Sequence, residues 1–585
     1  MYILGISAHY HDSAAALLQD GVIIAAIQEE RLSRIKHDNA FPLLAANQCM
    51  ALAGITSDAI DCIVYYEKPF WKFERILDTI TNRIPFTYQH FAKAIPLWVK
   101  NRLWIGSEIR KTLNFKGKVL YAAHHDSHAA AAYYSSEFKD AAIITLDGVG
   151  EHTTTTISCY ENNKFELLRE QHFPHSLGLL YSAFTQYCGF KVNSGEYKLM
   201  GLAPYGKPVY KQLIYDALIE LFPDGSYRLN MNYFNYSEGL SMINRNFEKL
   251  FGKPQRKPES EIDLFYKDVA ASIQAVLEEV TLKIVKIAKA LTLKQNVVFA
   301  GGVALNCKLN QKIVEEKIFE SHYFYPCPGD AGSAVGAAYL GWHQFHQKIS
   351  PAKRGSEVYL GNALNEYPKV TTTEEALLKN KIPFTKIAGD IEIISEALAA
   401  GKIVGWYNGR MEFGPRALGN RSILADPRQS TMKAILNEKI KLRENFRPFA
   451  PAVLYEKATE LFELGTANYN TMMVTAAAKR GTAELMPAVI HEDGTARIQT
   501  VSKTDNRPFY ELLQSFYEKT GCPALINTSF NVRGEPIVAS LEDAIRTFLY
   551  TDMDILVFDG EFMICKSSDL KSVMKTIQPN LYADD

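Results

Sequence analysis

The first part of the chain alternates short apolar runs with turns of small and polar residues. A tract beginning at Ile3 aligns without a gap with a tract beginning at Ile143, an offset of 140 residues. The shared pattern predicts a duplicated unit of three strands, at residues 3–7, 13–18 and 22–28 and again at 143–147, 153–158 and 165–169. Turn-forming triplets, Gln19–Asp20–Gly21 and Glu161–Asn162–Asn163, separate the second and third strands of each copy.

The turn after the first strand of each copy, at residues 8–12 and 148–152, exposes backbone N–H groups that suit phosphate oxygens. Two such copies facing one another form a nucleotide cleft, as in the actin-like ATPase and sugar kinase superfamily; two unrelated hairpins are the alternative. Farther on, an apolar strand enters Gly301–Gly302, and a helix pattern starts near Ala304. Glycines at such a turn let a ligand approach the backbone closely.

Two histidines and an aspartate are candidate metal ligands. His124 and His128 stand four residues apart in a predicted first helical turn, so they share one face. Two neutral imidazoles on one face bind a transition metal, although a cap or a surface histidine explains the same pattern. Asp330 follows another strand and precedes the small residues 331–338, so it either caps a helix or reaches a metal across the cleft.

The pattern loosens over residues 351–372, and a strand beginning at Ile403 opens a stretch of different composition. We therefore expect a domain at 1–350, a linker at 351–372 and a second domain at 373–585. Converging arginine forks in the second domain indicate a site for more than one phosphate; a solvated basic face and a nucleic-acid surface are the alternatives. The cations concerned are Arg410, Arg416, Arg421, Arg428, Lys441, Arg443 and Arg447.

Composition narrows the classes of function. The 585 residues are 47% hydrophobic and 22% charged, as in ordinary globular proteins. Lys plus Arg, 64, nearly equals Asp plus Glu, 65, so a net charge of −1 provides no field for nucleic acid or a membrane surface. The start lacks a signal-peptide pattern, and no run of about 20 apolar residues occurs. The eight cysteines form no CxxC pair, and we expect reduced thiols in a cytoplasmic protein.

Seven segments occur in a fixed order along the chain: GISAHYHDSAAAL, EERLSRIKHD, HHDSHAAAA, LDGVGE, SGEYKLMGLAPYG, FAGGVALN and PGDAGSAVGAA. Together they resemble the O-carbamoyltransferases of the NodU/CmcH family over nearly the full length. The resemblance implies an α/β fold in which an actin-like N-terminal domain precedes a YrdC-like C-terminal domain. Residues 205–261 match no segment of the family, and we expect acceptor specificity to lie there.

For the N-terminal domain, the resemblance implies that His124, His128 and Asp330 bind Fe(II) or Zn(II), with Asp147 close by. Such a set leaves coordination positions open. His11, in the first turn, would face the same cleft as the general base for an acceptor hydroxyl. Asp12 is a further catalytic candidate, and the remaining expected cleft and nucleotide-binding residues are Lys36, Lys198, Gly301, Gly302 and Asn306.

For the C-terminal domain, the strand in GCPALINTSFNV leads to hydroxyl and amide groups that suit a phosphate or a carbamoyl amide, at Asn527, Ser529 and Asn531. The resemblance implies that carbamoyl phosphate and ATP bind along Arg416, Lys441, Arg447, Arg497 and Ser529. Of these, Lys441 and Arg416 are expected to act in catalysis.

The implied reaction has two steps. Carbamoyl phosphate and ATP with Mg²⁺ give carbamoyl-adenylate and pyrophosphate in the C-terminal domain, and the carbamoyl group then passes to a hydroxyl of a small-molecule acceptor in the N-terminal domain. We expect no nucleic-acid or membrane partner, and the resemblance is compatible with a homodimer. The alternatives are a sugar-type kinase, which would make ADP in the same N-terminal cleft, and a non-enzymatic nucleotide-binding regulator.

Overall fold

The chain forms two compact units. The computed structural model describes residues 1–566 except 82–86, 88–94, 97, 101, 162–163, 238, 240, 347–357, 364–371 and 380. Unit 1 comprises Met1–Ile24, Asn39–Met50 and Gly54–Ser356, and unit 2 comprises Ala25–Asp38, Ala51–Ala53 and Glu357–Asp585. Most of the predicted linker at 351–372 lies outside the described residues, as does the predicted turn at Asn162–Asn163.

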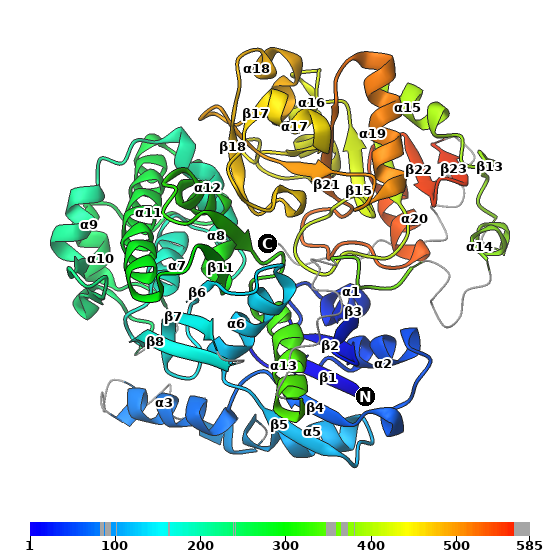
Figure 1. Cartoon of the computed structure of the whole chain (residues 1–585). Helices are drawn as coiled ribbons and strands as arrows, with labels where there is room; N and C mark the ends of the chain where they lie inside the picture. The colour runs from blue at the N-terminus through cyan, green and yellow to red at the C-terminus, as the bar shows by residue number, and fades with distance from the viewer. Residues whose placement is uncertain are drawn as a thin grey trace. The chain divides into compact units, whose positions relative to one another are not determined.

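Unit 1 contains two five-stranded sheets of the same topology (Figure 1). In each, the first strand pairs antiparallel with the next strand and parallel with a later one. The first sheet has the order β3 (Val22–Gln28), β2 (Ala14–Gln19), β1 (Tyr2–Ser7), β4 (Cys62–Tyr65), β5 (Lys118–Tyr121). The second has the order β8 (Lys164–His172), β7 (Thr153–Glu161), β6 (Ala142–Leu146), β11 (Asn296–Ala300), β12 (Ser321–Phe324). The predicted duplication and its six strands are therefore confirmed.

The central strands of these sheets are apolar because both of their faces are covered. Ile3 and Ile6 on β1 and Ile143 and Ile144 on β6 have no exposed surface. A strand buried on both faces reads as a continuous apolar run, which is why the sequence locates these strands well. The outer strand β8, by contrast, has only exposed and half-buried positions.

Helices α6 (His124–Ser135) and α13 (Asp330–Phe345) of unit 1 lie against each other, and α13 also packs on β1, β2 and β4 (Figure 1). A Cβ atom on Gly336 of α13 would lie 1.7 Å from the carbonyl oxygen of Ser127 on α6. One on Gly5 of β1 would lie 1.9 Å from the carbonyl oxygen of Ala334. The small residues predicted at 331–338 are therefore required by close backbone contact on two sides of α13.

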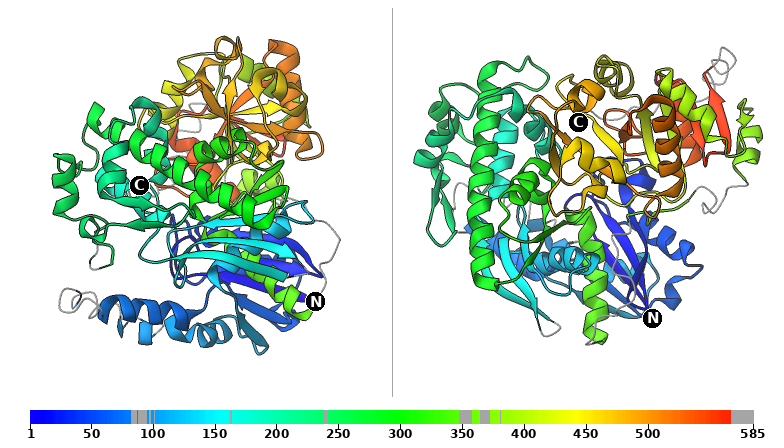
Figure 2. Two further views of the ribbon diagram at one scale, coloured as in Figure 1. Left: turned by 60° about the vertical axis from the view of Figure 1, so that its left-hand side comes forward. Right: turned by 45° about the horizontal axis from the view of Figure 1, so that its top comes forward.

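The longest helix of unit 1, α11, runs past α7, α8 and α12 (Figure 2). The helices that begin in this unit are α2 (Leu43–Leu52), α3 (Pro69–Thr81), α5 (Ile105–Thr112), α6 (His124–Ser135), α7 (Leu177–Tyr187), α8 (Glu196–Leu202), α9 (Lys211–Ala217), α10 (Arg245–Phe251), α11 (Leu264–Thr292), α12 (Cys307–Glu315) and α13 (Asp330–Phe345). A short hairpin joins β9 (Ile219–Leu221) to β10 (Tyr227–Leu229).

Unit 2 is built on an eight-stranded mixed sheet. Its order is β13 (Thr385–Lys386), β23 (Phe562–Cys565), β22 (Ile555–Phe558), β14 (Val404–Tyr407), β15 (Arg421–Ala425), β21 (Ala524–Ser529), β16 (Ala450–Leu454), β20 (Gln499–Val501). A smaller sheet contains β17 (Phe462–Glu463), β18 (Thr475–Ala478) and β19 (Thr495–Arg497). The helices are α1 (Glu29–Ser33), α14 (Thr373–Lys379), α15 (Ile391–Ala399), α16 (Met432–Ile435), α17 (Tyr455–Leu461), α18 (Thr482–Leu485), α19 (Arg507–Thr520) and α20 (Leu541–Tyr550).

The mixed α/β class is confirmed in both units. All eight cysteines fall within the described residues, and none forms a disulfide. Over the same part of the chain, every helix is too short or too polar to cross a lipid bilayer.

We predict that Gly336→Ala destabilises unit 1, because the added methyl group meets the backbone of α6 rather than a side chain that can move aside. Overpacking of this kind costs about 1–3 kcal/mol of unfolding free energy. Thermal unfolding of the full chain measures the effect as a lower Tm. Gly329→Ala is the control, because its Cβ would meet nothing within 4 Å; equal Tm values for the two variants would contradict the prediction.

Candidate functional site

The four predicted metal ligands converge in unit 1. His124 and His128 project from the first two turns of α6, Asp147 directly follows β6, and Asp330 begins α13. The two Nε2 atoms lie 3.1 Å apart, and Asp147 Oδ2 lies 3.2 Å from His124 Nε2. Asp330 Oδ1 lies 3.7 Å from His124 Nε2 and 3.6 Å from His128 Nε2. One ligand atom from each residue lies within 4.8 Å of all the others.

The arrangement fits a transition metal. Two nitrogens 3.1 Å apart match ligands that bind one ion at about 2.1 Å each and nearly at right angles. Within the described part of the chain, the buried Oδ2 atom of Asp330 has no hydrogen-bond partner, so it is available as a ligand. His128 Nδ1 lies 3.1 Å from Ser333 Oγ. A proton on Nδ1 would therefore leave Nε2 as the metal-binding nitrogen.

Both carboxylates of the cluster are held in their anionic form. Burial by itself raises the pKa of Asp330, but His11, His128 and His124 outweigh it and lower the pKa. Burial likewise opposes the shift at Asp147, whose pKa falls well below its usual value because of its contact with His124 and the nearby His128. Deprotonated carboxylates are the form that a cation binds. Asp330 is not the side-chain cap considered as an alternative, because Gly329 occupies the N-cap position.

His11 and Asp12 form a pair beside this cluster. His11 Nδ1 lies 3.0 Å from Asp12 Oδ2, and both side chains are partly exposed. Burial lowers the pKa of His11, but the carboxylates of Asp330 and Asp12 outweigh it and raise the pKa to about 9. Asp12 adopts a left-handed backbone conformation with φ of 52°, which turns the chain after His11.

The Gly301–Gly302 turn connects to the same cluster. The Gly302 N–H donates to Asp147 Oδ1 over 2.9 Å. Gly301 has φ of 85°, and a Cβ there would lie 2.2 Å from the Leu146 carbonyl oxygen. Glycine is therefore required at 301 by the chain itself. Asn306 caps α12 through the Leu309 N–H and exchanges two hydrogen bonds with Gln274; its nucleotide role stays a prediction.

Three charged residues around His124 were not predicted from the sequence. Glu151 accepts hydrogen bonds from the backbone N–H groups of His124 and Lys68. Glu67 Oε2 lies 3.9 Å from His124 Nδ1 and accepts a 2.6 Å hydrogen bond from Lys72. Glu151 ends the LDGVGE segment, which was an available signal, whereas nothing in the spacing of Glu67 and Lys72 indicates the site.

Unit 2 contains a second polar site, centred on the buried side chain of Lys441. Its Nζ atom donates to the backbone carbonyl and, over 3.3 Å, to the hydroxyl of Ser529. It also donates to the carbonyl and side-chain oxygens of Asn531, each at 2.9 Å. Burial lowers the pKa of Lys441 well below its usual value, and the neighbouring Arg443 and Arg447 add to the shift. Lys441, Arg447 and Ser529 are therefore brought together, as expected.

Asn527 lies on the same strand as Ser529 but faces a different loop. Its amide donates to Gln499 Oε1 over 2.7 Å and to the Ala417 carbonyl over 3.2 Å. Gln499 in turn donates to the Leu418 carbonyl. These bonds fix the backbone that follows Arg416, so Asn527 supports that loop. Arg497 is the last residue of β19, and its predicted ligand contact stays a prediction.

Three members of the arginine-rich segment bind acceptors within the protein, and the interpretation as a phosphate-binding residue is wrong for the fully buried Arg421. Arg421 has no exposed surface and donates to backbone carbonyl groups, and Arg410 also binds backbone carbonyl groups. Arg428 binds Asp426 through both carboxylate oxygens. The alternative of a solvated face is also wrong for Arg421, because this side chain is fully buried. The spacing of charges in a sequence identifies cations, but it cannot show that backbone carbonyl groups of the folded chain will be their acceptors.

Lys36 does not lie in the unit in which the sequence predicted it. It lies in unit 2, where its charge contributes to the lowered pKa of Lys441, instead of in the cleft of unit 1. The reason is that the chain passes into unit 2 within β3, before it reaches this lysine. Lys198 is in unit 1, buried on α8.

Two built polar sites with perturbed pKa values are typical of an enzyme. Comparison with known proteins identifies the family to which this enzyme belongs. Residues 2–339 match the family described as carbamoyltransferase N-terminus, and residues 395–566 match carbamoyltransferase C-terminus. The chain therefore belongs to the carbamoyltransferase family and is a carbamoyltransferase, which confirms the resemblance seen in the sequence.

Relatives match over most of the chain. The uncharacterized protein sll1178 of Synechocystis is 45% identical, with 97% of each chain covered. Nodulation protein NolNO of Sinorhizobium fredii is 36% identical, with 95% of this chain and 79% of that protein covered. Nodulation protein NolO of Bradyrhizobium diazoefficiens is 35% identical, with 76% of this chain and 78% of that protein covered.

We predict that the purified protein binds about one equivalent of a transition metal and that His128→Ala or Asp330→Ala removes it, since each deletes a ligand. Elemental analysis after dialysis measures the metal content. His125→Gln is the matched control, because His125 is buried on the same helix and lies near Thr156 Oγ1, but it supplies no ligand atom to the cluster. Unchanged metal content in His128→Ala and Asp330→Ala would rule out the cluster as the binding site.

Proposed function

We propose that the protein is an ATP-dependent O-carbamoyltransferase that forms carbamoyl-adenylate in unit 2 and transfers the carbamoyl group to a hydroxyl of a small-molecule acceptor in unit 1. The observation that carries the proposal is the separation of two chemically different sites. A cationic site around Lys441 suits phosphate chemistry, whereas the His124 cluster suits a metal. In this scheme, unit 1 corresponds to the actin-like domain and unit 2 to the YrdC-like domain of the family.

The first step takes place at Lys441. Hydrolysis of carbamoyl phosphate releases phosphate and carbamate. A carbamate oxygen then attacks the α-phosphorus of ATP, and the bond from that phosphorus to the bridging oxygen breaks, releasing pyrophosphate. Fixed cations stabilise the charge that moves onto the leaving oxygens, and Mg²⁺ accompanies ATP as usual. The residues proposed to bind the two substrates are Lys441, Arg416, Arg447, Arg497 and Ser529, with Lys36 close to Lys441.

The second step takes place beside the His124 cluster. His124, His128 and Asp330, with Asp147, would hold Fe(II) or Zn(II), and such an ion supplies Lewis-acid polarisation of an oxygen. His11 accepts the proton of the acceptor hydroxyl as that oxygen attacks the carbamoyl carbon, and AMP leaves.

Asp12 keeps the His11 ring oriented through Nδ1, which leaves Nε2 to act as the base. The charge of Asp330 is the strongest cause that raises the pKa of His11. Ligation of Asp330 to such an ion would offset that charge and would favour the neutral imidazole that a base requires. The Gly301–Gly302 turn is the proposed neighbour of the adenosine.

We predict that ATP is converted to AMP and pyrophosphate only when carbamoyl phosphate is present, as nucleotide separation would show. Lys441→Ala should abolish this conversion, because it removes the buried cation of the adenylating site. His128→Ala should retain it while losing transfer to an acceptor.

ADP formation that is independent of carbamoyl phosphate would point to the kinase alternative. Loss of pyrophosphate release in His128→Ala would contradict the assignment of the two steps to two units. His125→Gln serves again as the control for substitution of a buried histidine on α6.

We further predict that kcat/KM for carbamoyl phosphate falls as pH rises, and that the fall begins below the pH at which an ordinary lysine loses its proton. A lysine is charged below its pKa, and the pKa of Lys441 is lowered, chiefly by burial. Its positive charge is therefore lost as pH rises through that lowered value. Lys441→Arg should move the fall to higher pH, since arginine stays charged. Initial rates of pyrophosphate release across pH give the profile, and identical profiles for the two proteins would exclude Lys441 as the titrating group.

A further inference from the structure

The segment Ala25–Asp38 lies early in the sequence but belongs to unit 2. It contains α1, in which Glu29, Glu30 and Arg31 are all buried. Three consecutive charged side chains are rarely buried without specific partners. The contacts that this segment makes within unit 2 therefore indicate what it does there.

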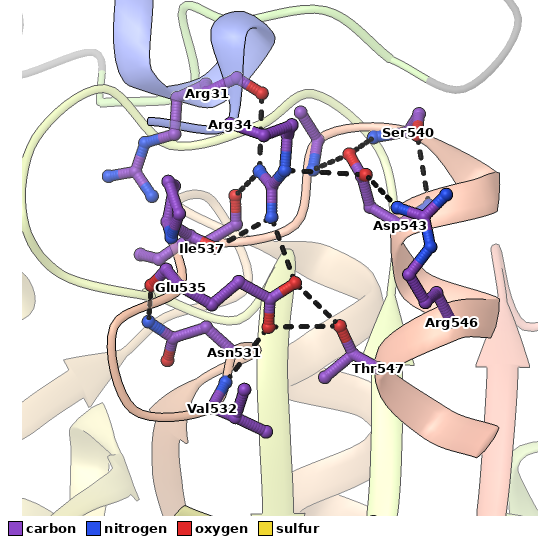
Figure 3. A network of polar contacts seen from close by, with 12 residues as sticks. Arg31, Arg34, Asn531, Val532, Glu535, Ile537, Ser540, Asp543, Arg546 and Thr547 are labelled. Atoms are coloured by element: carbon purple, nitrogen blue, oxygen red, sulfur yellow. Dashed lines mark hydrogen bonds and ion pairs between the residues drawn. The ribbon is translucent and has the colours of Figure 1, made fainter. Parts of the chain in front are cut away.

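Arg34 follows α1 and binds the loop at residues 531–537 of unit 2 (Figure 3). Its Nη1 donates to the Ile537 carbonyl over 2.7 Å, and its Nη2 donates to the Pro536 carbonyl over 2.9 Å and to Glu535 Oε1 over 3.1 Å. Its Nε lies 3.4 Å from Asp543 Oδ1. The side chain of Arg34 is 14% exposed and that of Glu535 only 2%. A planar guanidinium can reach several acceptors at once, which a lysine cannot.

Hydrogen bonds connect this loop to Lys441. Glu535 Oε2 accepts the Val532 N–H over 3.0 Å, and the Glu535 carbonyl accepts from the Asn531 amide over 2.6 Å. The carbonyl and side-chain oxygens of Asn531 then receive Lys441 Nζ. Two residues, Glu535 and Asn531, thus link Arg34 to the buried lysine. Thr547 on α20 donates to both oxygens of Glu535 and completes its hydrogen bonds.

Arg31 holds a second loop from the same short helix. Its Nη2 donates to the Gly414 carbonyl over 2.7 Å, and Gly414 is two residues before Arg416 in the sequence. The same Nη2 also donates to Gln28 Oε1, at 3.1 Å within the segment. The two loops that α1 and Arg34 contact are therefore the ones that carry Arg416 on one side and Ser529 and Asn531 on the other.

We infer that the segment 25–38 positions the adenylate-forming site of unit 2 and that Arg34 is a positioning residue for Lys441, acting through Glu535 and Asn531. This inference rests on the proposed function of unit 2. Arg34 touches no substrate in this scheme. It fixes the loop whose oxygen atoms hold the lysine ammonium group where the phosphate groups are to bind.

The test uses the full-length protein with Arg34→Gln, Arg34→Lys and the matched control Arg546→Gln. Arg546 also contacts Asp543, at 3.5 Å, but among the described residues it forms no hydrogen bond or ion pair with the 531–537 loop. Its substitution therefore removes the same charge from the same network. Since a displacement of about 1 Å can lower catalysis about 100-fold, we expect Arg34→Gln to reduce kcat/KM for carbamoyl phosphate about 10- to 100-fold. Arg34→Lys should recover only part of that loss, and Arg546→Gln should match the wild type.

Hydrogen–deuterium exchange of a peptide spanning 529–540 provides a readout that does not depend on activity. We expect faster exchange there in Arg34→Gln and not in Arg546→Gln, with the metal content of unit 1 unchanged in both. Unchanged exchange in Arg34→Gln overturns the inference, as does faster exchange with an unchanged kcat/KM, or equal losses in the two variants. A wild type that releases no pyrophosphate refutes the proposed function and the positioning role together, while exchange still decides whether Arg34 holds the loop.

Discussion

The candidate metal-ligand cluster of unit 1 depends on one close contact between two helices. His124 and His128 come from α6 and Asp330 from the start of α13, so the separation of these helices sets the distance between the nitrogen and carboxylate ligands. Gly336 permits that separation, because any larger residue would meet the Ser127 carbonyl. The same α13 lies on β1, and the turn after β1 carries His11 and Asp12. One helix thus places the candidate ligands relative to the candidate base.

The surroundings of the two sites have opposite effects on buried charged groups: they favour the ionised form in unit 1 and disfavour it in unit 2. In unit 1, histidines keep two buried carboxylates anionic against the effect of burial. In unit 2, burial and neighbouring arginines weaken the hold of Lys441 on its proton, although oxygen atoms of Ser529 and Asn531 surround it. An anionic ligand would relieve the repulsion around Lys441, and a cation would relieve that between Asp147 and Asp330. The site around Lys441 is therefore complementary to an anion, and the cluster around His124 is complementary to a cation.

Much of unit 1 could be predicted from its sequence because strands buried on both faces and turns of small residues leave strong local patterns. His124 and His128 were predictable for a similar reason, since helical spacing alone puts them on one face. Glu67 and Lys72 were not, because their role depends on contacts between segments far apart in the chain. The sequence also predicted a phosphate-binding role for Arg421 that the fold excludes. In the structure, its guanidinium group donates hydrogen bonds to backbone carbonyl groups from distant parts of the chain.

The place of Ala25–Asp38 in unit 2 also bears on how the chain is made. Arg31 is synthesised 383 residues before the Gly414 carbonyl that it binds, and Arg34 precedes Ile537 by 503 residues. During synthesis from the N-terminus, Arg31 and Arg34 are therefore made long before the carbonyl groups that they bind. Closure of such long loops carries a large entropic cost and is slow. The hydrogen bond between Arg34 and the Ile537 carbonyl thus forms only after residue 537 has been translated.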